Sequence, residues 1–199
     1  MGCDIHVRTE VLFRDKWFDC DHYQRNRYYE EEYDDGEPEW EVLPIYDGRS
    51  YILFGILAGV RSNENEPIDE PRGLPADCNK HIREDSDNWG VDGHSHSYFT
   101  LRELLEYRVK HPKVKVSGMI SAESAKKLDE TGETPKEWCG WTNEADWVFR
   151  EWKADSPLND IINSLIKREC EEFWIFNKDR DKKILENADK IRIVFWFDN

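Results

Sequence analysis

The chain is organised around one stretch, Trp89-Gly-Val-Asp-Gly-His-Ser-His-Ser-Tyr-Phe-Thr-Leu-Arg-Glu-Leu-Leu-Glu-Tyr107, in which a polar loop leads into a helix. Thr100 is the expected N-cap of that helix, and Glu103 three residues later completes a capping box. Leu101 and Leu104 begin the apolar side of the helix. Backbone N–H groups are free at a helix start and the helix dipole favours anions there, so we expect chemistry in the loop before Thr100.

Composition narrows the class of protein. The chain has 199 residues, which suits a single α+β domain over 1–199 with an acidic surface insertion at about 21–41. A net charge of −15 argues against broad binding to nucleic acid or to an anionic membrane, because phosphate groups require clustered lysine and arginine. Five scattered cysteines without a CxxC pair, and no evident signal peptide or membrane span, predict a cytoplasmic protein with free thiols.

Local patterns outside the central stretch predict the remaining framework. Alternating residues from Cys3 to Cys20 indicate a β-hairpin, and residues 191–197 are apolar enough for a strand inside a sheet. We predict an α+β fold in which this hairpin and the C-terminal strand form an antiparallel or mixed sheet. About three helices should pack on it, at residues 51–60, 101–110 and 157–176.

Two further segments differ in their signals. A short strand is expected at 114–119, followed by a small helix at 122–130 that Ser121 caps. The segment 63–89 shows no periodicity and contains three prolines, so we expect a long loop without regular structure. Such a loop is either functional or an ordinary surface loop stiffened by its prolines.

Histidine and aspartate residues suggest a metal site. Asp4-Ile-His6 and Asp92-Gly-His94-Ser-His96 supply ligand types that suit zinc, manganese or iron. If the N-terminal strand meets the loop, the five side chains can hold a divalent metal ion that activates water. The alternative is that Asp92 and Ser95 organise a turn through local hydrogen bonds and the histidines are structural donors near the helix start.

A second set of residues suggests contacts to phosphate. Arg72 beside Gly73 offers a guanidinium fork and an accessible backbone, although a proline-rigid loop with a surface arginine explains the same residues. Ser95, Ser97 and Thr100 lie just before the predicted helix and complete the candidate ligand-binding set.

Four tryptophans occur close together in Trp138-Cys-Gly-Trp141 and Trp147-Val-Phe-Arg-Glu-Trp152. Such residues can stack on a base or a sugar. Packing in the core and at its rim is the competing interpretation, because aromatic side chains dominate protein cores.

Several motifs together resemble a family of bacteriophage and prophage proteins. They are Met1-Gly-Cys-Asp-Ile-His6, Leu53-Phe-Gly-Ile-Leu-Ala-Gly-Val-Arg61, Pro71-Arg-Gly-Leu-Pro75, Asp92-Gly-His-Ser-His-Ser97 and the terminal Arg-Ile-Val-Phe-Trp-Phe-Asp. The resemblance covers most of the chain and is least clear over 21–41. It implies a viral origin, a place in the host cytoplasm and accessory roles such as interference with host defence; it assigns no catalytic residues.

Three functions are compatible with these observations. The first is a metal-dependent hydrolase acting on a phosphate ester or nucleotide. The second is a non-catalytic protein that sequesters a small nucleotide signal. The third is an acidic protein that blocks a host defence factor through residues such as those at 30–35. The sequence does not determine the oligomeric state, the ligand or the metal.

Overall fold

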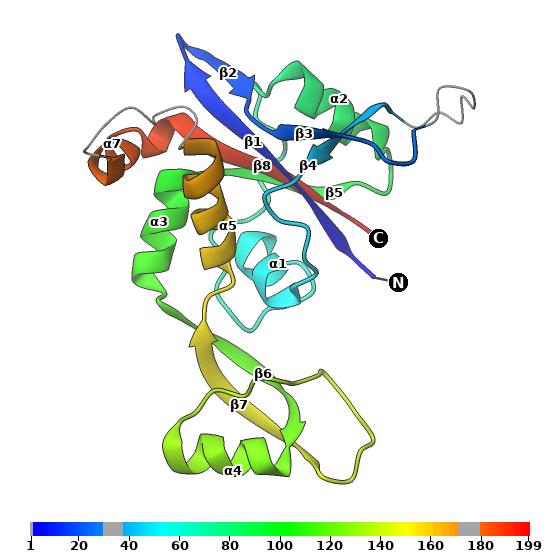
Figure 1. The fold of residues 1–199 in the computed structure, drawn as a ribbon, viewed down its shortest axis with the longest axis vertical. Helices are drawn as coiled ribbons and strands as arrows, with labels where there is room; N and C mark the ends of the chain where they lie inside the picture. The colour runs from blue at the N-terminus through cyan, green and yellow to red at the C-terminus, as the bar shows by residue number, and fades with distance from the viewer. Residues whose placement is uncertain (1, 30–37, 171–179) are drawn as a thin grey trace.

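A four-stranded antiparallel sheet forms the centre of the computed structural model, which describes residues 2–29, 38–170 and 180–199. Its strand order is β2-β1-β8-β5, so the C-terminal strand lies between the N-terminal strand and the strand that precedes the central helix (Figure 1). The bounds are β1 Asp4–Phe13, β2 Lys16–Asp19, β5 His94–Thr100 and β8 Ile191–Asp198. The predicted α+β class, with the hairpin and the C-terminal strand in one sheet, is confirmed.

The predicted β-hairpin is formed by β1 and β2, with a two-residue turn. Phe13 pairs with Lys16, and the two residues between them, Arg14 and Asp15, both have positive φ values, 48° and 62°. Two left-handed residues match the right-handed twist of the flanking strands.

One face of the sheet carries most of the hydrophobic core. Helices α1 (Tyr51–Ala58), α3 (Leu101–Lys110) and α5 (Leu158–Ser164) pack against it, as predicted from their apolar residues. Phe54 of α1 meets Phe197 of β8 edge to face, with ring centroids 5.1 Å apart. The predicted helix at 157–176 continues beyond α5 as a π-helix, Leu165–Cys170, and its last part lies outside the described residues.

Helix α2 (Lys80–Asn88) covers part of the opposite face. Ile82 of α2 packs there with Val194 and Trp196 of β8. The expectation that 63–89 lacks regular structure is wrong over α2. Only Ile82 and Ser86 are buried in this helix, so it has no apolar stripe to reveal it.

The prediction of a polar loop before α3 is wrong as well, because residues 94–100 form the strand β5. The register of β5 against β8 shifts between His94, which pairs with Phe197, and Ser97, which pairs with Phe195. Two residues therefore oppose Trp196 in a β-bulge, and Ser95 adopts a φ of +51°. The bulge interrupts the alternation by which a strand is recognised. The capping box of Thr100 and Glu103 is confirmed.

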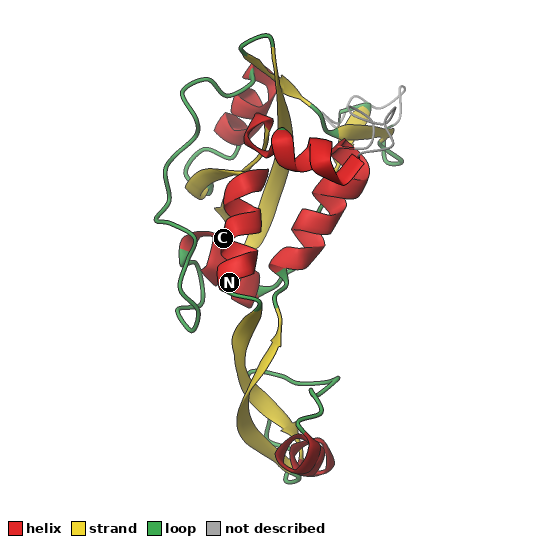
Figure 2. Ribbon diagram, turned by 90° about the vertical axis from the view of Figure 1, so that its left-hand side faces the viewer, coloured by secondary structure: helices red, strands yellow, loops and turns green. Residues whose placement is uncertain are grey.

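A two-stranded arm projects from the main body, as Figure 2 shows. The arm consists of β6 (Lys113–Ser121) and β7 (Trp147–Asp155), with α4 (Ala122–Thr131) at its far end. Asn65 anchors its base: its side-chain amide donates to Lys115 O at 2.9 Å and accepts from Lys115 N at 2.8 Å. The strand and the capped helix predicted here are both confirmed.

The smaller elements complete the fold. They are β3 (His22–Arg25), β4 (Trp40–Leu43), α7 (Arg180–Glu186) and a 3-10 turn, Ala188–Lys190. The strands β3 and β4 pair at the two ends of the insertion predicted at about 21–41, whose centre at 30–37 lies outside the described residues. Across the described ranges, every helix falls short of the length or apolar character that a membrane span needs.

Candidate functional site

The polar face of β1 is arranged as its alternation predicts. Asp4 and His6 pair across the sheet with Asp198 and Trp196, so the four side chains share one face. His6 lies against Trp89 with ring centroids 4.1 Å apart, and its Nε2 lies 3.4 Å from Asp198 Oδ2. His6 is thus held between an indole and a carboxylate.

Asp4 forms an ion pair with Arg49. The Arg49 guanidinium donates to the carboxylate, with Nε to Oδ1 at 2.7 Å. This hydrogen bond, together with the positive charge, holds the pKa of Asp4 below its usual value. The pair is exposed, so we assign it little stability.

The two histidines of β5 lie on different faces of the sheet. His94 stacks on Phe197 at 6.0 Å, on the side of α1, whereas His96 stacks on Trp196 at 6.2 Å, on the side of α2. Asp92 is exposed in the turn before β5. Within the described ranges, no three histidine, cysteine or acidic side chains are placed to hold a metal ion. The divalent metal site at Asp4, His6, Asp92, His94 and His96 stays a prediction.

Burial has an electrostatic consequence at His96. It lowers the pKa of His96, and the nearby His94 lowers it further. The neutral imidazole is therefore the form that suits this side of the sheet.

The predicted phosphate contacts are already engaged within the chain. Arg72 donates from Nη1 to Glu103 at 2.7 Å and from Nε to Asp69 at 3.0 Å. The backbone N–H groups of Arg72 and Gly73 donate to Ser97 Oγ and to His96 O. These hydrogen bonds attach the loop that contains Arg72 to β5 and to the first turn of α3.

Two other predicted contacts have partners as well. Ser95 Oγ lies 3.0 Å from His94 Nδ1, and the N–H of Thr100 donates to Glu103 at 2.7 Å. The role of this set in binding phosphate stays a prediction, and its observed role is to join the loop at 69–78, β5 and α3.

Sequence reasoning missed two buried arginines on the same polar face. Arg8 donates to three carboxylates and to Tyr23, while Arg192 donates to Glu10 at 2.6 Å and lies 3.8 Å over the ring of Trp17. The carboxylates around Arg8 are Asp19, Asp21 and Asp85. Burial opposes the charge of Arg8, but these acids raise its pKa above the ordinary value. The networks join β1, β2, β8 and α2, so their observed role is structural.

The largest of the described cavities lies elsewhere, where the start of α1 and the loop after it meet β6, β7 and the loop at 138–140 of the arm. We call it the arm groove; its volume is about 650 Å³, within the range of small-molecule sites. Its lining residues are Arg49, Ser50, Tyr51, Ile52, Arg61, Ser62, Glu64, Ser117, Gly118, Trp138, Gly140 and Phe149.

Three aromatic side chains line the arm groove and remain exposed: Tyr51 (40%), Trp138 (44%) and Phe149 (54%). Trp138 is fixed by an edge-to-face contact with Trp152, at 5.9 Å between centroids. It also lies over Gly118, where an added Cβ would approach the indole to 2.8 Å. A ring held in this way and left open to solvent offers a face on which a planar ligand can stack.

The arm groove also contains an arginine that can meet an anion. Arg61 lies in it with a φ of +61°, and its Nη2 donates to Asn199 Oδ1 at 2.5 Å. Among the described residues, no carboxylate forms an ion pair with Arg61. The first turn of α1, which carries no acidic residue, faces the same groove. An arginine without an ion-pair partner in the described chain, lining the same cavity as a helix start, suits an anionic group.

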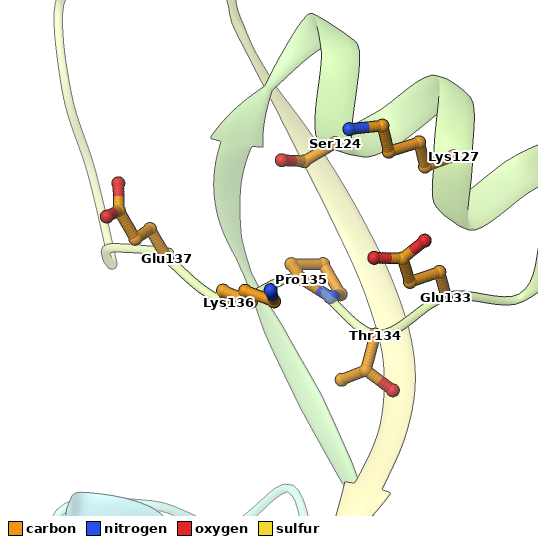
Figure 3. Close-up of a pocket in the computed structure, with 7 residues that line it drawn as sticks. All are labelled: Ser124, Lys127, Glu133, Thr134, Pro135, Lys136 and Glu137. Carbon is orange, nitrogen blue, oxygen red and sulfur yellow. The ribbon is translucent and has the colours of Figure 1, made fainter.

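Two of the smaller pockets differ from the arm groove in chemistry. The pocket beside α4 has a volume of about 250 Å³, and Figure 3 shows Ser124 and Lys127 of α4 facing the loop at 133–137. It has no aromatic lining, and its lysines and glutamates balance in charge. The other, of about 270 Å³, lies along Asp4, His6 and Arg8, which are bonded to neighbouring side chains.

Comparisons of the chain with protein-family models, with curated proteins and with solved structures give no match.

Proposed function

We propose that the protein binds a small anionic ligand with a planar ring, of the nucleotide class, in the arm groove and releases it unchanged. One observation carries this proposal: exposed aromatic rings and an arginine without a carboxylate partner in the described chain line the same cavity of about 650 Å³. Stacking on an aromatic ring contributes about 1–3 kcal/mol per base, which is enough to orient a nucleotide.

The anion would be held locally. The protein carries a net charge of −15, which opposes the approach of an anion at long range. At physiological salt that repulsion extends only about 8 Å. Arg61 and the start of α1 act within this distance, so they can outweigh the overall charge.

Binding without catalysis fits the rest of the site. Arg49 and Asp4 neutralise each other, and the acidic lining residue, Glu64, accepts a hydrogen bond from Ser117. The resemblance to bacteriophage proteins, itself a prediction, would make the ligand a nucleotide signal of an infected cell.

Isothermal titration of the intact protein with mononucleotides tests the proposal. We expect saturable binding with one ligand per chain, and we expect chromatography to recover the ligand unaltered. Conversion of the nucleotide during the titration would instead support the hydrolase, and the absence of binding by every nucleotide would refute a nucleotide site.

A further inference from the structure

Glu64 is the acidic side chain in the lining of the arm groove. Its Oε1 accepts a hydrogen bond from Ser117 Oγ on β6, and both residues line the groove. No hydrogen bond or ion pair within the described ranges involves Oε2, and the residue is exposed. The carboxylate is therefore oriented through Oε1, which keeps a second acceptor site, while Oε2 has no partner in the described chain.

A carboxylate accepts hydrogen bonds and donates none while it is ionised. It pairs best with a planar group that presents two parallel N–H donors, as the arginine fork does. Among the common bases, guanine has such an edge, formed by N1–H and the N2 amino group. Adenine and cytosine each place a ring acceptor beside the amino group, and uracil flanks its N–H with two carbonyl oxygens.

Glu64 and Arg61 lie three residues apart in the loop that follows α1, and both line the groove. Their Cα atoms lie at most about 10 Å apart, because three residues of fully extended chain span no more. This limit is comparable to the separation between the base edge and the phosphate of a mononucleotide. Phe149 lies on β7 and Trp138 lies in the loop between α4 and β7, so the arm supplies two of the aromatic rings. The loop after α1 therefore supplies two polar groups for a ligand whose ring stacks on the arm.

We propose that the arm groove prefers a guanine-type base, which Glu64 recognises through two N–H donors. This inference rests on the proposed function, and it adds the class of base. A bidentate pair of this kind discriminates between bases by about 1–3 kcal/mol. We therefore expect GMP to bind about fivefold to 150-fold more tightly than AMP.

The test titrates the intact protein with GMP, AMP, CMP and UMP. Glu64→Gln should weaken GMP about tenfold and leave AMP within about twofold, because the amide turns one acceptor into a donor. Glu66→Gln is the matched control: it makes the same change two residues away, at a side chain outside the groove lining, and should leave every affinity unchanged.

The outcomes separate the two proposals. Equal affinity for GMP and AMP, or a guanine preference that survives Glu64→Gln, would overturn the base assignment while leaving a nucleotide site in place. No binding by any of the four nucleotides would overturn both.

Discussion

Replacing Arg61 by glycine separates the stability of the fold from its capacity to bind a ligand. Arg61 adopts a φ of +61°, a conformation that costs an ordinary residue roughly 1–2 kcal/mol and glycine very little. Against this gain stand the hydrogen bond to Asn199, which is exposed, and the greater chain entropy of glycine, each of about 1 kcal/mol or less. The free energy of unfolding should therefore change by no more than about 1 kcal/mol in Arg61→Gly.

Ligand affinity should respond differently. A hydrogen bond from an arginine to an anion contributes about 1.5–3 kcal/mol, so Arg61→Gly should weaken nucleotide binding roughly tenfold to a hundredfold. Isothermal titration measures the affinity, and thermal unfolding should show a Tm within about 4 °C of the wild type.

Arg14→Gly is the control for this experiment. Arg14 also has a positive φ, +48°, but it lies in the β1–β2 turn, away from the arm groove. The Arg14→Gly substitution removes the same charge and relieves the same kind of backbone strain. It should leave the affinity for the nucleotide unchanged. The reasoning is refuted if Arg61→Gly binds as the wild type does, or if both variants lose affinity equally.

Three further predictions address the stacking ring, the partly buried His96 and the thiols. Trp138→Ala should reduce the affinity for the nucleotide about fivefold to a hundredfold. Trp141→Ala is the control, because that ring is 78% exposed and lies outside the groove lining, and it should leave the affinity unchanged. Equal losses in titration would argue against stacking on Trp138. Burial lowers the pKa of His96, so the unfolded chain binds a proton that the folded chain resists, and stability should fall as the pH drops below about 6.5. Urea unfolding from pH 5 to 8 should show this slope and a smaller one in His96→Phe; identical slopes would contradict the assignment. Burial raises the pKa of the Cys78 thiol to about 12, so little of it is thiolate at pH 8. Peptide mapping after iodoacetamide treatment at pH 8 should find the partly exposed Cys139 labelled well before Cys78. Equal labelling rates would contradict this prediction.

The sequence predicts those elements whose signals are local. The β1–β2 hairpin depends on alternation and a two-residue turn, and α1 and α3 depend on capping residues beside apolar runs. The strand β8 is recognisable because a strand buried on both faces is continuously apolar. In each case the determining residues lie within about ten positions of one another.

The elements that were missed lack such signals. The strand β5 contains a bulge opposite Trp196 that breaks its alternation, and α2 buries only Ile82 and Ser86. The histidines of β5 were grouped by spacing in sequence, yet His94 and His96 stack on opposite faces of the sheet. A bulge of one residue changes which face a side chain occupies, and spacing alone does not reveal it.

The arm groove was beyond prediction for a different reason. Its lining comes from four segments, at 49–52, 61–64, 117–118 and 138–149, that the fold brings together. The tryptophan-rich segments were recognised as possible stacking residues, and Trp138 is the one among them that lines the groove. No sequence pattern marked Arg61 as a candidate, because its ability to bind an anion depends on the lack of an ion-pair partner in the described structure.

Hydrogen exchange of the intact protein, with and without saturating GMP, tests the location of the site most directly. Slower amide exchange is predicted at residues 49–52, 61–64 and 138–140, with little change at 72–73 and 94–97. Protection confined to 72–73 and 94–97 would contradict the account and return the site to the histidine strand.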